Sequence, residues 1–238
     1  RVDHQETEKE GEIEMSLYFG VFISLFAYLI GMKLKKKFGW PVLNPLLVAI
    51  ILVIAFLKAT GISYTDYNTG ASYISYFLTP STVCLAIPLY KQLELLKKNL
   101  TAVAAAITAG VIGSVVSVYV MSMIFRLEHV HYVSLLPKSI TTAIGMGVSE
   151  EAGGIVTMTI VSIILTGILG NIVADGWFKF VGIKEPIAKG LALGTSAHAI
   201  GTAKALELGE VEGAMSSLSI AVAGLMTVVA VPIMSGLL

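Results

Sequence analysis

The stretch LTAVAAAITAGVIGSVVSVYVMSMIF, residues Leu100–Phe125, decides the fold class of this chain. It carries no charged side chain from end to end, and a helix needs about 20 apolar residues to cross the roughly 30 Å hydrocarbon core of a bilayer. Four further uncharged stretches have the same character: Met15–Met32, Trp40–Leu57, Ala152–Ala174 and Gly213–Leu238. The sequence therefore predicts an all-α integral membrane protein.

The composition excludes several classes of protein. Hydrophobic residues make up 55% of the chain and charged residues 13%, against about 45–50% and about 25% in soluble domains. The 16 basic and 16 acidic residues balance, but six of the acids lie in Arg1–Glu14, so the apolar body is net basic. An ordinary soluble enzyme, a nucleic-acid binder and a disordered protein do not fit these values. The single cysteine, Cys84, excludes a disulfide scaffold.

The acidic segment Arg1–Glu14 is expected to be a disordered or added tail, with Met15 as a natural start. Residues 15–238 are expected to form a single transmembrane domain. The sequence contains no HExxH, GxSxG or Walker signature, and His129 and His131 have no partner acids or cysteines at metal-ligand spacing. We therefore expect no enzyme activity, no cofactor and no metal site.

Three shorter segments are apolar but rich in Gly, Pro, Ser and Thr: Tyr73–Tyr90, Ser134–Val148 and Ile187–Ala203. They are either loops or interrupted membrane helices. We interpret them as interrupted helices, because each precedes a long apolar span. Backbone that is not helical is tolerated at membrane depth only where protein or a water-filled cavity surrounds it.

An internal repeat supports this interpretation. The three segments contain similar strings, LTPSTVCLAIPLYKQ from Leu78, LPKSITTAIGMGVSEE from Leu136 and LGTSAHAIGTAKALE from Leu193. Each is followed by a charged break and then a long apolar stretch. Repeated units with broken helices in corresponding positions are the best sequence indication of a transporter binding site. The alternative is chance similarity among helices rich in small residues.

The lysines predict the orientation of seven to eight transmembrane helices. Positive loops face the cytoplasm, so the cluster Lys33–Lys37 and the group Lys91, Lys97 and Lys98 are predicted to be cytoplasmic and the amino terminus external. If all three interrupted segments cross the membrane, there are eight spans and the loop Lys179–Lys189 is external, which is a mild exception to the rule. If either of the last two re-enters, the later topology flips.

The most informative segment is PKSITTAIGMGVSEEAGG, residues Pro137–Gly154. We expect Pro137 to begin a half-helix whose amino end, with its unpaired N–H groups and partial positive charge, favours a carboxylate. Lys138 supplies a counter-charge. The candidate substrate-binding residues are Pro80, Thr82, Lys138, Ser139, Thr141, Thr142, Ser196, His198 and Thr202. The alternative for any single hydroxyl is close helix packing, as is common in membrane bundles.

Glu150, Glu151 and Asn171 are candidates for ion or proton coupling, because carboxyl groups at membrane depth are costly and often functional. The two glutamates have an alternative role, which is to cap the following helix at the aqueous interface. Asn171 has the alternative role of an interfacial anchor. For His198 the alternative is a hydrogen bond to a backbone carbonyl at a helix break.

The motifs from Leu136 onward, together with LTPSTVCLAIPLYKQ, resemble those of the LrgB/CidB family of bacterial membrane proteins, and the resemblance covers the chain from Met15. It implies a small LrgA/CidA-like partner, a bacterial cell membrane, and a holin- or antiholin-like effect on murein hydrolases and lysis. It also implies a relation to a plastid glycolate/glycerate translocator and to pyruvate uptake. No site residue follows from the resemblance.

The residues favour one of these descriptions. Interrupted helices in matching positions and a buried His198 suit a carrier of small monocarboxylates better than a pore former, which needs only short oligomerising helices. The alternative is an antiholin-like regulator of murein hydrolases that transports nothing. A homodimer or higher homo-oligomer is expected by analogy with other carriers.

Overall fold

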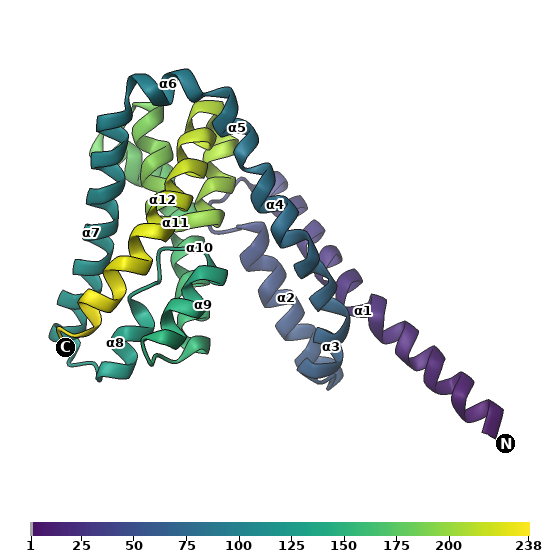
Figure 1. The fold of residues 1–238 in the computed structure, drawn as a ribbon. Coiled ribbons are helices and arrows are strands. Elements are labelled where there is room, and N and C mark those ends of the chain that lie inside the picture. The colour runs from purple at the N-terminus through teal and green to yellow at the C-terminus, as the bar shows by residue number, and fades with distance from the viewer. Residues whose placement is uncertain (1) are drawn as a thin grey trace. The chain divides into compact units, whose positions relative to one another are not determined.

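The structure is a computed structural model that describes residues 2–238, apart from the side chains of residues 2–17, Leu78, Thr79, Thr82 and Leu89. All regular elements in this range are helices, which confirms the predicted all-α class (Figure 1). In chain order they are α1 (Val2–Phe38), α2 (Pro45–Thr60), α3 (Tyr64–Ala71), the 3-10 helix η1 (Ser72–Phe77), α4 (Leu78–Cys84), α5 (Ala86–Lys91), α6 (Leu93–Lys98), α7 (Leu100–Phe125), α8 (His129–Leu135), α9 (Thr142–Glu151), α10 (Val156–Val181), α11 (Pro186–Leu208) and α12 (Glu210–Ser235).

Four helices in the described range are long and apolar enough to cross a membrane, which fits a membrane protein. They contain Tyr18–Phe38, Leu100–Phe125, Val156–Val181 and Glu210–Ser235. Helix α2 is apolar but has only 16 residues. The expected seven to eight spans and the internal repeat stay predictions.

The chain divides into two compact units, residues 1–84 and residues 85–238. In the first unit, α1 packs closely on α2 at Gly31, where a Cβ atom would lie 2.7 Å from the carbonyl oxygen of Pro45. The Ser24 hydroxyl and the Tyr67 hydroxyl, 2.7 Å apart, join α1 to α3. Asn44 caps α2 by accepting the N–H of Leu46 at 2.9 Å. The expectation of a single domain stays a prediction.

In the second unit the core lies along one face of α7. Its members recur every three or four residues, as one stripe of a helix requires: Val103, Ile107, Val111, Val115 and Val118. They pack with residues of α8, α9, α11 and α12 in one buried cluster. Large apolar side chains on other faces of α7, such as Ile112 and Ile124, are exposed. An apolar outer face is the surface that a helix presents to lipid.

The segment 129–151, here called hairpin 1, contains α8, a turn over residues 136–141, and α9. Its two arms return to the same place. The Thr159 hydroxyl of α10 lies 2.8 Å from the Ser134 carbonyl oxygen of α8 and 2.6 Å from the Ser149 hydroxyl of α9, and so bonds both arms. The expectation that a helix begins at Pro137 was wrong. Residues 136–140 form turns and a bend, and α9 begins only at Thr142.

Helix α11 is also a hairpin, here called hairpin 2 (Pro186–Leu208). The predicted interruption falls at His198, whose φ of 42° and ψ of −132° are not helical. The chain reverses there, since a Cβ atom on Gly201 would lie 2.5 Å from the carbonyl oxygen of Leu193. Both ends of the hairpin therefore reach the start of α12, where Gly190 packs against Glu212 and Leu206 packs against Gly213.

The two hairpins enter the second unit from opposite ends of α12. Hairpin 2 packs at the amino end of α12, as its contacts with Glu212 and Gly213 show. Hairpin 1 packs at the carboxyl end, where the Tyr132 hydroxyl donates to the Met234 carbonyl at 2.8 Å. The tips of the hairpins thus point toward the middle of the unit from opposite directions.

Candidate functional site

A cavity of about 540 Å³ lies between α7, α10 and the tips of the two hairpins. Hairpin 1 contributes Lys138 and Ser139 to its lining, and hairpin 2 contributes Thr195 and Ser196. Apolar walls come from α10, including Trp177. The structure therefore brings together three of the predicted substrate-binding residues, Lys138, Ser139 and Ser196.

Lys138 is the charged group of this cavity. Its Nζ atom donates to the Ser139 hydroxyl at 3.1 Å and, more weakly, to the Ser114 hydroxyl at 3.5 Å. Ser114 in turn donates to Ser139 at 2.9 Å. Throughout the described part of the chain, no carboxylate lies within the 4.0 Å ion-pair distance of this lysine. A cation inside a membrane bundle is costly without a partner, which makes Lys138 a candidate for binding an anion.

Two hydroxyls of hairpin 2 face the same cavity. Thr195 donates to the Leu191 carbonyl at 2.8 Å, and Ser196 donates to the Ala192 carbonyl at 2.6 Å. Both bonds run back one helical turn to a carbonyl of the same arm, so a ligand oxygen can replace that carbonyl as the acceptor. Rotation about the C–O bond therefore makes each hydroxyl available to a bound ligand.

Helix α7 supplies cavity residues that the sequence reasoning missed. Gly110, Gly113, Ser114 and Ser117 line the cavity, and their spacing places them on one face of the helix. Gly110 admits hairpin 2, because a Cβ atom there would lie 2.8 Å from the Thr195 hydroxyl. The glycines and serines that recur on one face of this span were the signal that could have found them.

His198 and Thr202 stabilise the tip of hairpin 2 and lie outside the cavity lining. The Nε2 atom of buried His198 lies 2.9 Å from the Ile163 carbonyl of α10. Thr202 donates to the His198 carbonyl at 3.0 Å and lies 2.7 Å from the Ser216 hydroxyl. His198 thus makes a hydrogen bond to a backbone carbonyl at a helix break, which is the alternative role considered for it from the sequence.

Of the remaining substrate-binding candidates, the two in the second unit, Thr141 and Thr142, do not line this cavity. Thr141 and Thr142, at the amino end of α9, are half-buried. Pro80 is exposed in the first unit, whose position relative to the cavity is not defined, and the side chain of Thr82 lies outside the described residues.

Glu150 and Glu151 are exposed in the last turn of α9. The N–H of Ile155, the residue before α10, donates to the Ser134 hydroxyl at 2.7 Å. The structure therefore places a serine of α8, rather than either glutamate, at the amino end of α10.

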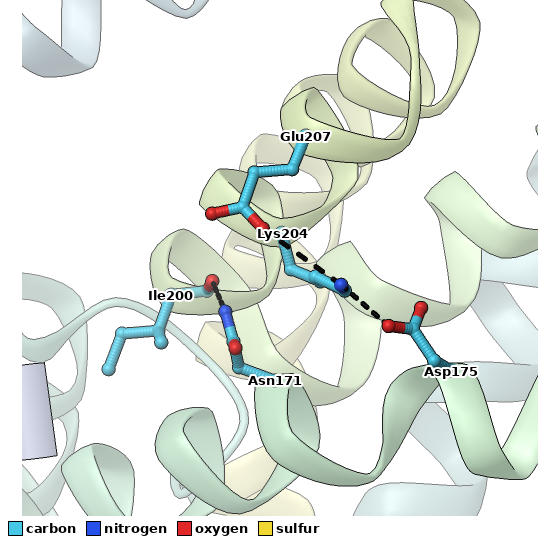
Figure 2. Close-up of polar contacts among 5 residues, drawn as sticks. All are labelled: Asn171, Asp175, Ile200, Lys204 and Glu207. Carbon is cyan, nitrogen blue, oxygen red and sulfur yellow. Dashed lines mark hydrogen bonds and ion pairs between the residues drawn. The ribbon is translucent and has the colours of Figure 1, made fainter. Parts of the chain in front are cut away.

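Asn171 belongs to a polar clasp between α10 and the second arm of hairpin 2 (Figure 2). Its Nδ2 atom donates to the Ile200 carbonyl at 3.2 Å, two residues beyond the break. One turn further along α10, Asp175 pairs with Lys204 at 2.8 Å, and Glu207 lies 3.9 Å from the same ammonium. Asn171 and Asp175 hold the returning arm of the hairpin in place.

The long apolar helices and the cavity between two helical hairpins fit a helical membrane protein with one charged side chain, Lys138, in its cavity lining. The chain belongs to the LrgB-like family, whose model matches residues 24–237.

Curated relatives agree with this assignment. The antiholin-like protein LrgB of Bacillus subtilis (strain 168) is 44% identical over 223 residues, covering 93% of this chain and 96% of the relative. The antiholin-like protein LrgB of Bacillus mycoides (strain KBAB4) is 44% identical over 219 residues, covering 92% and 95%. No solved structure matches the chain significantly.

Proposed function

We propose that this chain is a carrier of small monocarboxylates, of the pyruvate, glycolate or glycerate type, in the bacterial cell membrane, and that it is not an enzyme. The observation that carries the proposal is Lys138. Its ammonium group stands among hydroxyls, without a carboxylate within ion-pair distance in the described residues, where two hairpins meet. A monocarboxylate supplies the missing negative charge, and the serine hydroxyls bond its oxygens.

The cavity also fits such a substrate by size. Its volume of about 540 Å³ lies in the roughly 300–1,000 Å³ range of small-molecule sites. A three-carbon acid leaves room for water beside it. The apolar wall with Trp177 contacts a short carbon chain without offering further charge, which favours small monovalent acids over larger polyvalent ones.

The two hairpins support a carrier rather than an open pore. Broken helical segments that meet near the bilayer midplane are the usual substrate sites of secondary transporters. Because each hairpin returns to the end where it began, we infer that both re-enter the membrane rather than cross it. The crossings are then α1, α2, the segment 73–91, α7, α10 and α12, which is fewer than the expected seven to eight.

The lysines support this topology. With both hairpins re-entrant, Lys179, Lys184 and Lys189 lie on the same side of the membrane as Lys97 and Lys98. All five are then cytoplasmic, and the exception to the positive-inside rule disappears. The three related segments remain consistent with a repeat in which the second and third copies enter from opposite sides.

The second candidate function is an antiholin-like regulator that transports nothing, in keeping with the names of the Bacillus relatives. An LrgA/CidA-like membrane protein is the proposed partner under both readings, and a homodimer is the proposed assembly. The carrier hypothesis is favoured, because a regulator does not require the Lys138 ammonium group to lie inside the bundle without a counter-ion.

The test is uptake of labelled pyruvate, glycolate and glycerate into proteoliposomes that hold the purified chain, with and without an LrgA-like partner. We expect saturable uptake of at least one acid, competed by the other acids and not by the neutral amide of pyruvate. Absence of saturable uptake under both conditions contradicts the carrier and leaves the regulator.

A further inference from the structure

A second cavity, of about 240 Å³, is open to the surface of the unit and also contacts Lys138; its lining residue Phe125 is 70% exposed. It is lined by the second half of α7, including Ser122 and Phe125, and by Leu135 of hairpin 1. It shares two lining residues with the first cavity, Ser117 and Lys138. The two cavities therefore adjoin, with the lysine at their junction.

Together the cavities follow most of the length of α7. The first contacts the helix from Ala106 to Ser117, and the second continues from Ser117 to Phe125. At 1.5 Å per residue, the distance from Ala106 to Phe125 is about 28 Å, close to the thickness of the hydrocarbon core. Lys138 is located near the middle of this distance.

Ser122 independently indicates a ligand in the second cavity. Its side chain is 1% exposed, and its hydroxyl has no hydrogen-bond partner among the described residues. Other hydroxyls of the same helix do bond a carbonyl of the preceding turn, as Thr108 does to Ala104 at 2.8 Å. A buried hydroxyl left without a partner costs about 1–3 kcal/mol, and a bound ligand or water removes that cost.

We infer that the two cavities are successive sites for one small carboxylate, which passes along α7 while it stays within reach of Lys138. This inference rests on the proposed function. In the first site the ammonium group acts with Ser114 and Ser139. In the second it acts with Ser122, whose hydroxyl is shielded in this conformation and donates to the carboxylate after a rotation of its side chain.

The chemistry of the two sites makes the second the weaker one. Apart from Lys138, Ser117 and Ser122, its lining is apolar, consisting of Val118, Met121, Phe125, Leu127 and Leu135. A carboxylate there has fewer donors than in the first cavity. Transport requires a site that is favourable enough to enter and weak enough to leave, and the second cavity meets the latter need.

The single native cysteine makes a direct test possible. Cys84→Ser gives a cysteine-free chain, into which Ser122→Cys is introduced. The matched control is Thr227→Cys, which is equally buried in α12 and lines neither cavity. We expect a membrane-impermeant methanethiosulfonate reagent to label Ser122→Cys at least about tenfold faster than the control, because access to water limits the reaction of a thiol. Pyruvate at saturating concentration slows this labelling.

A transport measurement complements the labelling. Ser122→Phe fills the second cavity and abolishes uptake, whereas Ile124→Phe on the exposed face of α7 leaves uptake unchanged. Labelling of Ser122→Cys at the rate of the control, or labelling that pyruvate does not slow in a chain that transports pyruvate, overturns the second site. Absence of any wild-type uptake instead overturns the proposed function, while the labelling of Ser122→Cys still reports whether the cavity holds water.

Discussion

Hairpin 1 and hairpin 2 both reverse the direction of the chain inside the membrane bundle, but the backbone turns differently in each. Hairpin 1 uses a turn over residues 136–141, which brings Lys138 and Ser139 into the cavity. Hairpin 2 has no such turn. Its helix reverses at a single residue, His198, whose own side chain and the nearby Thr202 satisfy the groups at the break.

Hairpin 1 therefore contributes the charged group of the cavity, whereas hairpin 2 contributes hydroxyls beside a reversal point fixed by packing and hydrogen bonds. The tip of hairpin 1 has a charged group with no carboxylate at ion-pair distance among the described residues. The tip of hairpin 2 is buried, and its glycines allow close packing on α12 and on its own first arm. Substitutions at the first tip should therefore change transport, and substitutions at the second should change stability.

The largest expected effect is at the tip of hairpin 1. Lys138→Met removes the charge but keeps the length of the side chain, and we expect uptake to fall about 10- to 100-fold, since a hydrogen bond to a charged group is worth about 1.5–3 kcal/mol. Lys138→Arg should retain part of the uptake. Lys97→Met, at the exposed end of α6, is the control and should transport like the wild type. Equal uptake by Lys138→Met and Lys97→Met would contradict the role of the lysine.

The second effect concerns the packing of hairpin 2. Gly194→Ala places a methyl group 2.5 Å from the Ser216 carbonyl oxygen, and overpacking of this kind costs about 1–3 kcal/mol. Gly147→Ala in hairpin 1 meets open space and should stabilise its helix by about 0.5–1 kcal/mol. In thermal unfolding measured in detergent, the midpoint temperature should fall for Gly194→Ala and rise for Gly147→Ala. A change of the same sign in both variants would contradict the proposed difference between the two hairpins.

The third effect separates the side chain of His198 from its backbone. His198→Ala loses the bond to the Ile163 carbonyl and keeps the positive-φ strain of the wild type, so it should lower the free energy of unfolding by about 1–3 kcal/mol. His198→Gly loses the same bond but is relieved of about 1–2 kcal/mol of that strain, so it should be destabilised less than His198→Ala. The pyruvate concentration at half-maximal uptake should stay that of the wild type in both. A large rise of that concentration in His198→Gly would instead assign the histidine to the substrate.

The smallest effect is expected at the clasp. Asp175→Asn removes the ion pair with Lys204, but the Asp175 side chain is 49% exposed. Such a pair contributes under about 1 kcal/mol. Unfolding midpoints in low and high salt should therefore differ little between Asp175→Asn and the wild type. A loss as large as that of Gly194→Ala would mean that the clasp, rather than the glycine packing, holds hairpin 2 in place.

Much of the fold was available from local properties of the sequence. The charge-free run Leu100–Phe125 has the same bounds as α7, because charges and a loop limit the span on both sides. Lys138 was identified as a counter-charge for a carboxylate bound at the expected half-helix. The helix start was misplaced at Pro137 because proline permits a helix without forcing one, and Thr141 and Thr142 were assigned to the site on that basis.

What the sequence determined by itself is the membrane class, the long apolar helices and the segments where helices are interrupted, since hydrophobicity and local charge control these features. Only the tertiary structure shows which hydroxyls share a cavity with Lys138. Ser114 of α7, Ser139 of hairpin 1 and Ser196 of hairpin 2 come from different segments and line one cavity only because two hairpins enter from opposite ends of α12. The direction in which each hairpin returns depends on packing against α10 and α12, and no local pattern encodes that packing.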